Sequence, residues 1–334
     1  MTKLLVIIGI TGLQGSSVSR VFQNEPDWRI RGITRNPAKY KEDPQFQDVE
    51  LAAADLDDQT SLEKAFKGAN GIYAMTNFWE SLKEDATFQQ AENQGKKPNE
   101  IAMEREIQHG KNIIQAAAKQ VATLDRLVFS TLSDSNKWSN GEIKWNLHFD
   151  GKGRYEAYLK QQFPDLAKKT SYLHVGYYLS NWKMNPSFAP RKEEDGNFVI
   201  RKFGLPNGKP IPFINPPNDT GHFVRALILS PSAPPGSSML GYCELTTMEE
   251  YCTIWGGVHG VQCRAEVLTY EDALAQGMPE WMALEISESG TYVTKFGWAG
   301  GDPEVKHPKD LGVDVSKLTK IEEWIRQEDW SSVL

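Results

Sequence analysis

Three glycines spaced three residues apart constrain the fold of this chain more than any other feature of its sequence. The apolar run Lys3–Ile8 leads directly into Gly9-x-x-Gly12-x-x-Gly15, and a helical pattern begins at Leu13. Glycines between a strand and a helix allow a tight turn and close packing of the helix on the strand. A glycine triplet alone often marks an ordinary turn, but the flanking elements favour the first βα unit of a Rossmann-type domain.

The rest of the N-terminal half continues this pattern, because short β-type runs alternate with helical stretches. Such alternation predicts βαβ units and a parallel sheet. The expected strands are Lys3–Ile8, Arg29–Thr34, Val49–Ala54, Gly71–Thr76, Arg126–Thr131 and Ser171–Val175. The expected helices are Leu13–Gln23, Thr60–Phe66 with Thr60 or Ser61 as N-cap, Ile101–Gln120, and one that begins near Phe149. The expected fold class is α/β, a Rossmann-type doubly wound parallel sheet with a smaller C-terminal α+β lobe.

The pattern loosens after Val175, which suggests a division of the chain. We expect a Rossmann domain over residues 1–175, with a returning segment near 215–230, and a smaller substrate or partner lobe over 176–334. Before the division, the polar stretch Asn77–Glu100 is too long for an ordinary connection. It predicts a lid or a partly helical excursion.

Composition excludes several classes of protein. The formal net charge is −7 and no run of Lys or Arg stands out, which argues against direct binding to nucleic acid. The three cysteines are widely spaced and no His-Glu-x-x-His occurs, so we expect no metal site, no disulfide framework and a reducing cytoplasm. No apolar run reaches the ~20 residues of a membrane span. The protein is expected in the cytoplasm, and also in the nucleus if it is a regulator.

The glycine turn predicts a dinucleotide site, because the free N–H groups and the dipole of a helix N-terminus favour phosphate. The residues expected at the pyrophosphate are Gly9, Thr11, Gly12, Leu13, Gln14 and Gly15. An NAD-specific site carries an acidic residue about 20 positions further on, for the ribose 2′-hydroxyl. This chain has Arg35 there.

Arg35 favours NADP(H) over NAD(H), because a guanidinium binds a 2′-phosphate through two parallel hydrogen bonds. Thr34 and Asn36 could add neutral donors beside it. The alternative is a solvated arginine at a strand end, which is common at protein surfaces.

The ends of the later strands supply the remaining cofactor candidates. Asp55 and Leu56 follow the third strand and could bind the adenine, although a helix N-cap would explain Asp55 almost as well. Near the far half of the cofactor we expect residues that end strand four, namely Thr76, Asn77 and Phe78. Ser130, or alternatively Ser133, near the end of strand five, is a further candidate.

With these residues the chain resembles the NmrA-like family of atypical short-chain dehydrogenase/reductases, both its fungal members and a mammalian NADPH sensor. The matching segments are Gly9–Gly15, Thr34–Pro37, Ala54–Leu56, Leu127–Thr131, His148–Gly153 and Asp219–Phe223. The string His-Phe-Asp-Gly-Lys-Gly at 148–153 is the most specific of them. The resemblance implies an NADP(H)-binding Rossmann lobe with a smaller lobe over the nicotinamide, and it implies that Tyr177 lines the substrate cleft.

The resemblance also directs attention to the catalytic positions. Ordinary short-chain dehydrogenases use Tyr-x-x-x-Lys, and here the lysine would be Lys152, with His148 four residues before it. Positions i and i+4 share a helix face, so His148 could take the place of the tyrosine as proton donor. The Lys152 cation would favour a neutral ring unless an anion compensates, and Asp150 faces another way. Lys152 is expected to hold the cofactor ribose.

Two functions remain open from the sequence. In the first, the chain is an NADPH-dependent reductase of a carbonyl, imine, enone or quinone of a small apolar substrate. In the second, it is a redox sensor that binds NADP(H) and acts through a regulatory protein partner. The oligomeric state is open.

Overall fold

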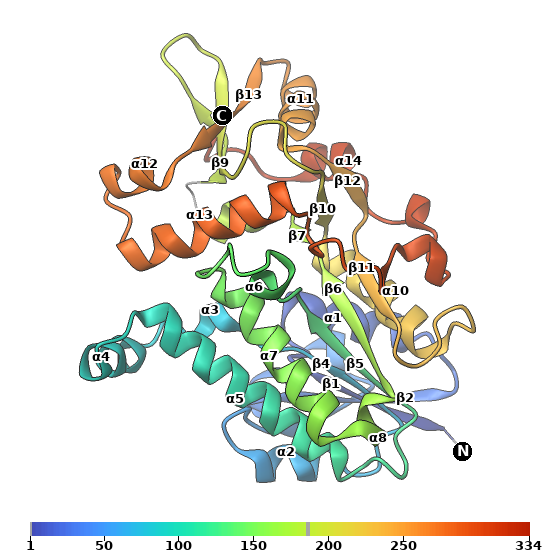
Figure 1. Ribbon diagram of the computed structural model, residues 1–334. Coiled ribbons are helices and arrows are strands. Elements are labelled where there is room, and N and C mark those ends of the chain that lie inside the picture. Colours follow the sequence, from blue (N-terminus) through green and yellow to red (C-terminus); the bar gives the residue numbers. More distant parts are fainter. Residues whose placement is uncertain (1, 185–187) are drawn as a thin grey trace.

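A large parallel sheet organises the fold. The computed structural model describes residues 2–184 and 188–334 (Figure 1). Its eight-stranded sheet has the order β14-β11-β6-β5-β4-β1-β2-β3, and every neighbouring pair runs parallel. The strands are β1 (Lys3–Ile8), β2 (Trp28–Thr34), β3 (Val49–Ala53), β4 (Gly71–Ala74), β5 (Arg126–Thr131), β6 (Thr170–Val175), β11 (Ser238–Gly241) and β14 (Val305–Lys306).

The strand order reverses between β1 and β4. From β1 the chain adds β2 and β3 on one side, and then returns to add β4, β5 and β6 on the other. In such a doubly wound sheet the carboxyl ends of the strands open a crevice at the point of reversal. The expected fold class is therefore confirmed, and the reversal locates the edge where a ligand would bind.

Helices cover both faces of the sheet, as the alternation of side chains along β1 requires. Leu5 and Ile7 join one core with α1 (Leu13–Phe22) and α10 (Pro216–Leu229). Leu4, Val6 and Ile8 join another core with residues of α2, α5 and α7. The helices on this second face are α2 (Gln59–Phe66), α5 (Pro98–Ala118), α7 (Leu147–Gln162) and α8 (Pro164–Ala167) (Figure 1).

The expected elements agree with the observed ones to within a few residues, with two informative differences. Asp58 caps α2, because its Oδ1 accepts the backbone N–H groups of Thr60 and Ser61 at 2.9 and 3.2 Å. Neither Thr60 nor Ser61 is the N-cap, since a carboxylate one turn earlier already satisfies those N–H groups. The helix α5 begins at Pro98, where proline fits because the first helical N–H has no intrahelical partner.

The polar stretch Asn77–Glu100 is a helical excursion. It contains α3 (Phe78–Ser81), α4 (Asp85–Gln94) and the first turn of α5. Gly95 ends α4 with a left-handed φ of 64°, which glycine adopts without strain.

The C-terminal part adds two small sheets, with orders β12-β10-β7 and β13-β9-β8. Its strands are β7 (Tyr177–Tyr178), β8 (Arg191–Lys192), β9 (Phe198–Phe203), β10 (Ile211–Ile214), β12 (Glu244–Thr246) and β13 (Cys263–Leu268). Its helices are α9 (Asn181–Met184), α11 (Met248–His259), α12 (Tyr270–Ala275), α13 (Glu280–Lys295) and α14 (Ile321–Gln327). A short helix α6 (Ser135–Trp138) precedes α7.

The C-terminal part also returns to the large sheet through α10, β11 and β14. Gly221 of α10 donates its N–H to Ser17 Oγ at 3.0 Å, and a Cβ atom there would lie 2.4 Å from the Ser17 carbonyl oxygen. Only glycine permits this approach of α10 to α1. The domain division at residue 175 stays a prediction.

Three further observations concern the part of the chain that the structure describes. No helix there is both long and apolar enough to cross a bilayer. No group of three or more His, Cys, Asp or Glu side chains there could hold a metal ion. Cys243, Cys252 and Cys263 are free thiols.

Candidate functional site

The glycine turn forms an open anion cradle at the carboxyl end of β1. Gly9 has a φ of 66°, and its carbonyl accepts the Gly12 N–H at 2.9 Å. A Cβ atom at Gly15 would lie 2.2 Å from the Gly9 carbonyl oxygen, so glycine is required there. Thr11, Gly12 and Leu13 are exposed, and no side chain caps α1. The first N–H groups of α1 are therefore available to a phosphate, and the cradle fits a pyrophosphate.

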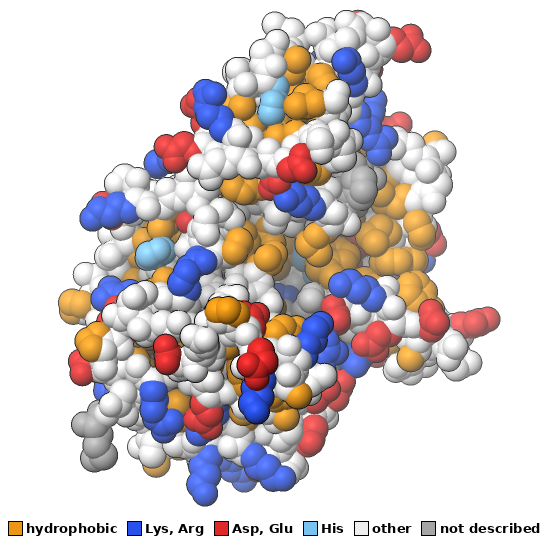
Figure 2. All heavy atoms as spheres, turned by 180° about the vertical axis from the view of Figure 1, so that it is seen from behind, with side chains coloured by type: hydrophobic (Ala, Val, Ile, Leu, Met, Phe, Trp, Pro, Cys, Tyr) orange, Lys and Arg blue, Asp and Glu red, His pale blue; other side chains and the backbone are white. Residues whose placement is uncertain are grey.

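Hydrophobic side chains gather near the middle of the face that Figure 2 shows, around a hollow between the upper and lower parts of the molecule. Charged side chains predominate below the hollow (Figure 2). An apolar recess with a charged border is the usual character of a small-molecule site.

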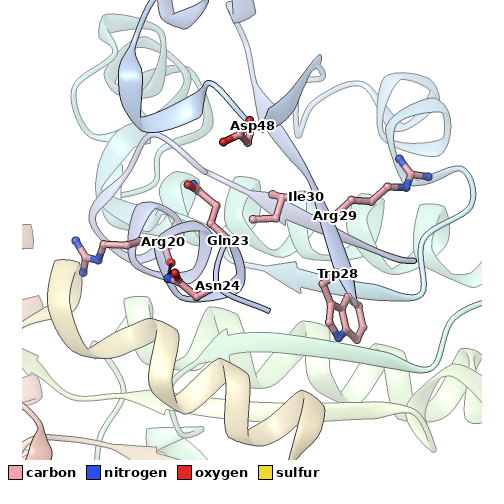
Figure 3. A pocket seen from close by; sticks show the side chains of 7 residues that line it. All are labelled: Arg20, Gln23, Asn24, Trp28, Arg29, Ile30 and Asp48. Atoms are coloured by element: carbon pink, nitrogen blue, oxygen red, sulfur yellow. Dashed lines mark hydrogen bonds between the residues drawn. The ribbon is translucent and has the colours of Figure 1, made fainter. Parts of the chain in front are cut away.

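A cavity of about 360 Å³ lies away from the crevice (Figure 3). Its lining includes Trp28, Arg29 and Ile30, which open β2, and residues near the end of α1. Arg35 lies past the opposite end of the same strand. This cavity is therefore at the amino edge of the sheet, where a doubly wound fold does not bind its nucleotide.

Arg35 follows β2 at the crevice and lies beside a carboxylate, that of Glu80. Thr34 ends the strand, its carbonyl accepts the Ala54 N–H at 3.3 Å, and the Arg35 and Asn36 side chains are exposed. Nη2 of Arg35 lies 3.5 Å from Oε1 of Glu80 in α3. A hydrogen bond from Lys83 and the positive charges of Lys83 and Arg35 lower the Glu80 pKa.

Asp55 follows β3 and does not cap a helix. Its Oδ1 accepts the Asp57 N–H at 3.0 Å, and its own N–H donates to Ser61 Oγ at 3.0 Å. The N-cap alternative for Asp55 is wrong, because Asp58 holds that position. The Leu56 carbonyl accepts from Asn112 Nδ2 at 2.7 Å, which fixes this turn on α5.

Two predicted cofactor residues turn their side chains into the protein. Gln14 Oε1 accepts from Tyr73 Oη at 2.5 Å and from Ser130 Oγ at 2.8 Å. Gln14 Nε2 donates to Tyr178 Oη at 2.6 Å. Gln14 can therefore reach a phosphate through its backbone only, and Ser130 is held 3% exposed. The alternative Ser133 pairs with Tyr292 Oη at 2.8 Å.

The end of β4 leads toward the catalytic candidates. Thr76 is buried and its Oγ1 donates to Glu106 Oε1 at 2.7 Å, whereas Asn77 is exposed. Phe78 is 1% exposed and packs in a small apolar cluster with Met103 and Leu147. Of these three predicted residues, Asn77 is the one whose side chain is free to meet a ligand.

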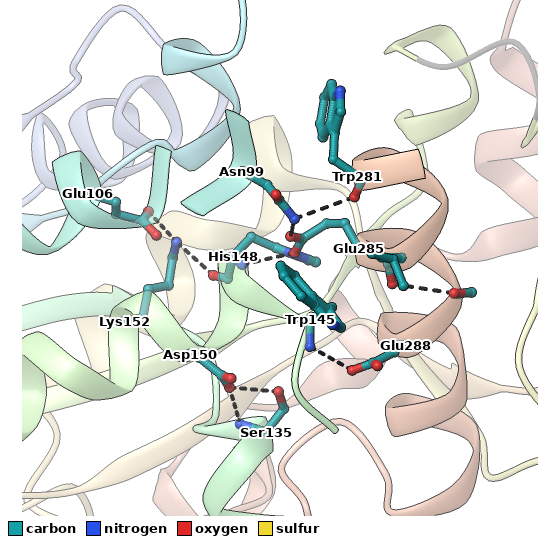
Figure 4. Close-up of polar contacts among 12 residues, drawn as sticks. Asn99, Glu106, Ser135, Trp145, His148, Asp150, Lys152, Trp281, Glu285 and Glu288 are labelled. Atoms are coloured by element: carbon teal, nitrogen blue, oxygen red, sulfur yellow. Dashed lines mark hydrogen bonds and ion pairs between the residues drawn. The ribbon is translucent and has the colours of Figure 1, made fainter. Parts of the chain in front are cut away.

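Lys152 of α7 is paired inside the protein with Glu106 of α5. Its Nζ lies 2.5 Å from Glu106 Oε1 and 3.3 Å from the His148 carbonyl oxygen (Figure 4). The Glu106 side chain has no exposed surface, and its Oε2 has no hydrogen-bond partner within residues 2–184 and 188–334. Because Oε1 also accepts from Thr76, one carboxylate joins Lys152 to the end of β4.

His148 is paired with a second buried carboxylate, from the C-terminal helix α13. Its Nδ1 lies 2.6 Å from Glu285 Oε1, and Glu285 Oε2 accepts from Asn99 Nδ2 at 3.0 Å (Figure 4). Asp150 instead accepts from the Ser135 N–H and Oγ at 2.7 and 2.6 Å, which turns it away from His148. Glu285 supplies the compensating anion that the residues near His148 in sequence do not.

Tyr177 of β7 lies among aromatic rings. It packs against Phe213 and Trp298 with ring centroids 5.5 and 6.5 Å apart. Burial raises its pKa to about 12, so it stays a neutral phenol at physiological pH.

Sequence reasoning missed Glu106 and Glu285. Glu106 had a weak signal, because it lies three residues after Met103 and four before Gly110 on the buried face of α5. A carboxylate on an apolar helix face requires a partner. No comparable pattern in the sequence of α13 indicated that Glu285 is buried and paired.

The doubly wound sheet with its glycine turn defines a Rossmann-type α/β protein. The sequence matches the model of the NmrA-like family over residues 1–325. The chain therefore belongs to the NmrA-like family, which confirms the resemblance.

Several curated fungal proteins of the family are similar in sequence. The chain is 28% identical over 320 residues to the NmrA-like family domain-containing oxidoreductase hkm9 of Aspergillus hancockii, covering 92% of this chain and 88% of that protein. It is 26% identical over 335 residues to the oxidoreductase FrzB of Cladobotryum sp., covering 96% and 92%.

Solved structures share the fold. The negative transcriptional regulator NmrA in complex with NADP has a TM-score of 0.69 at 18% identity, covering 98% of this chain and 95% of that one. The NADPH-dependent quinone oxidoreductase QOR2 of Escherichia coli, complexed with NADPH, has a TM-score of 0.66 at 19% identity, covering 97% and 99%.

Proposed function

We propose that this chain binds NADP(H) and is an NADPH-dependent oxidoreductase that reduces a carbonyl, imine, enone or quinone of a small apolar substrate. The observation that carries the proposal is the pairing of both catalytic candidates with fully buried carboxylates, Lys152 with Glu106 and His148 with Glu285. Burying charged groups is costly even when they are paired, and such groups are concentrated at functional sites.

Cofactor binding is supported by the crevice itself. The open cradle at Gly9–Gly15 suits a pyrophosphate, and Arg35 stands where a 2′-phosphate would extend past β2. The structures of NmrA and QOR2 with NADP and NADPH show that this fold accommodates the dinucleotide in those proteins.

Chemistry would require a hydride and a proton. Bound NADPH supplies the hydride from its nicotinamide ring. Lys152 is held in place by Glu106 and would orient the ribose, while the His148 imidazole would provide the proton. Lys152 and His148 lie one helical turn apart on α7 and so face the same side.

An apolar substrate is supported by the rings around His148. The centroids of Trp79 and Phe78 lie 5.0 and 5.9 Å from the imidazole. The curated relatives hkm9 and FrzB are named oxidoreductases, which favours a reductase.

A redox sensor is the second candidate, and two observations favour it. His148 replaces the catalytic tyrosine of ordinary short-chain dehydrogenases, and NmrA, which shares the fold, is a negative transcriptional regulator. Such a sensor would bind NADP(H) in the same crevice and act through a protein partner, in the cytoplasm or the nucleus.

Turnover distinguishes the two functions. The protein is incubated with NADPH and a panel of quinones, aldehydes and imines while the absorbance of the reduced cofactor is followed. The reductase predicts turnover that Lys152→Ala lowers at least about 100-fold and that Arg154→Ala, an exposed control on the same helix, leaves unchanged. Absence of turnover, with different thermal stabilisation by NADP⁺ and NADPH, would favour the sensor, because a switch needs differential affinity.

A further inference from the structure

One carboxylate holds His148 at two atoms. Glu285 Oε1 accepts the His148 backbone N–H at 3.0 Å and lies 2.6 Å from Nδ1 of the same residue. The backbone contact places the carboxylate at the N-terminal turn of α7, where the Asn146 N-cap makes no side-chain cap. A negative charge is favourable at this end of a helix. The backbone contact therefore keeps the carboxylate beside the ring, and rotation of the ring would lose the contact at Nδ1.

Glu285 is itself fixed. Its side chain has no exposed surface, and Oε2 accepts from Asn99 Nδ2 at 3.0 Å. The bonded atoms come from α5, α7 and α13, so three helices meet at this carboxylate (Figure 4). A buried carboxylate retained at such a junction needs hydrogen-bond donors on both oxygens, and it has them.

The chemistry of the Glu285–His148 pair indicates which ring nitrogen carries a hydrogen. An ionised carboxylate only accepts hydrogen bonds, so the nitrogen that faces it must carry a hydrogen. We infer that Glu285 is a positioning residue that keeps a hydrogen on Nδ1 of His148 and offsets the charge of the protonated ring, so that Nε2 delivers the proton to the substrate. This inference rests on the proposed reductase function.

Other charged groups near the ring are engaged elsewhere. Lys152 is paired with Glu106 and Asp150 with Ser135, while Glu288 of α13 accepts the Trp145 N–H at 2.6 Å. The ring centroids of Trp79 and Phe149 lie 5.0 and 4.9 Å from that of the imidazole, and 14% of the His148 side chain is exposed. His148 Nε2 makes no hydrogen bond to any residue that the structure describes. Glu285 is thus the one carboxylate in contact with the imidazole in this part of the chain.

The step balances in atoms and electrons. The carbonyl carbon gains a hydride with its electron pair, and the carbonyl oxygen gains the proton from His148 Nε2. The N–H bond at Nε2 breaks and an O–H bond forms, which yields the alcohol. The ring is left neutral with its hydrogen on Nδ1, and water returns a proton to Nε2.

The tautomer of His148 tests the inference without turnover. Long-range ¹H–¹⁵N spectra are recorded at alkaline pH, where histidine rings are ordinarily neutral, on the full chain labelled in its six histidines. The His148 signal is assigned by its loss in His148→Gln. We expect the Nδ1–H form in the unmodified protein. The Nε2–H form would overturn the inference even if neither Glu285 variant folded.

Two variants of Glu285 then test whether its carboxylate sets the tautomer of His148. Glu285→Gln places an amide against the ring that can donate or accept, so Nε2–H should become populated, whereas Glu285→Asp should retain Nδ1–H. The kcat for an aldehyde should fall at least about tenfold in Glu285→Gln, with the NADPH dissociation constant changed less than about twofold. An unchanged tautomer or an unchanged kcat would contradict the inference.

The two proposals fail separately. If no probe is turned over while His148 shows the expected tautomer, the proposed reduction is wrong and Glu285 still orients the ring. If aldehydes are reduced while His148 carries its hydrogen on Nε2, the reduction stands and the role of Glu285 is wrong.

Discussion

Lys152 Nζ lies 2.5 Å from Glu106 Oε1, and the two side chains are 10% and 0% exposed. This pair joins α7 to α5, and through Thr76 it reaches the end of β4. Removing one member of a buried pair leaves the other charged and without a partner, which is more destabilising than removing both.

The first prediction concerns the energetic coupling between Lys152 and Glu106. Lys152→Met should lower the free energy of unfolding by about 3–5 kcal/mol, because Glu106 loses the cation that balances it. The double variant Lys152→Met/Glu106→Leu should recover most of that loss. Urea unfolding of the single and double variants measures the coupling, with Arg154→Met as an exposed control on α7. Additive effects would contradict a buried ion pair.

Local patterns explain which parts of this structure the sequence could predict. The strand β1, the turn at Gly9–Gly15 and the start of α1 are adjacent in the chain, and their geometry follows from a continuous apolar run and from glycine. The carboxylates at the catalytic candidates could not be predicted this way. His148 and Glu285 are separated by 137 positions, so their contact depends on how α13 packs against α7.

The directions in which side chains point could not be predicted from the sequence either. The pattern around Gln14 fixes a helix start, and it does not show that the amide turns inward to Tyr73, Tyr178 and Ser130. The Glu80 carboxylate beside Arg35 belongs to α3, and only the fold brings these two elements together.

Glu80 leads to the second prediction. A carboxylate 3.5 Å from Arg35 opposes an incoming 2′-phosphate, so Glu80→Gln should bind NADPH several-fold more tightly. The gain should shrink at high salt, because the two side chains are 69% and 41% exposed and salt screens such charges. Fluorescence titration with NADPH measures it. Glu104→Gln, which removes a similar surface carboxylate paired with Lys96, should have no effect, and weaker binding in Glu80→Gln would contradict the prediction.

The third prediction concerns pH, through two groups on either side of Thr131. Thr131 donates to Glu156 and pairs in register with His174 of β6. Burial raises the Glu156 pKa from 4.5 to about 7 and lowers the His174 pKa from 6.5 to about 4. Stability from Glu156 is therefore lost as pH rises from 4.5 to 7, and stability from His174 is lost as pH falls from 6.5 to 4.

The two effects oppose each other between pH 4.5 and 6.5. The stability of Glu156→Gln relative to the unmodified protein should grow as pH rises through this window. The relative stability of His174→Asn should grow as pH falls through it. Urea midpoints measured at several pH values between 4.5 and 7.5 test both signs, and parallel curves for the three proteins would contradict the prediction.

The fourth prediction concerns Arg35 and tests the dinucleotide assignment itself. A bidentate, charge-assisted contact to the 2′-phosphate is worth about 1.5–3 kcal/mol, or about 10- to 100-fold in affinity. The dissociation constants of NADP⁺ and NAD⁺ are measured by titration calorimetry for the unmodified protein and for Arg35→Glu. Arg29→Glu, at the opposite edge of the sheet, is the control.

We expect the unmodified protein and Arg29→Glu to prefer NADP⁺ by at least about tenfold, and Arg35→Glu to lose that preference. Equal affinities for NADP⁺ and NAD⁺ in the unmodified protein, unchanged in Arg35→Glu, would contradict the assignment of this crevice to NADP(H).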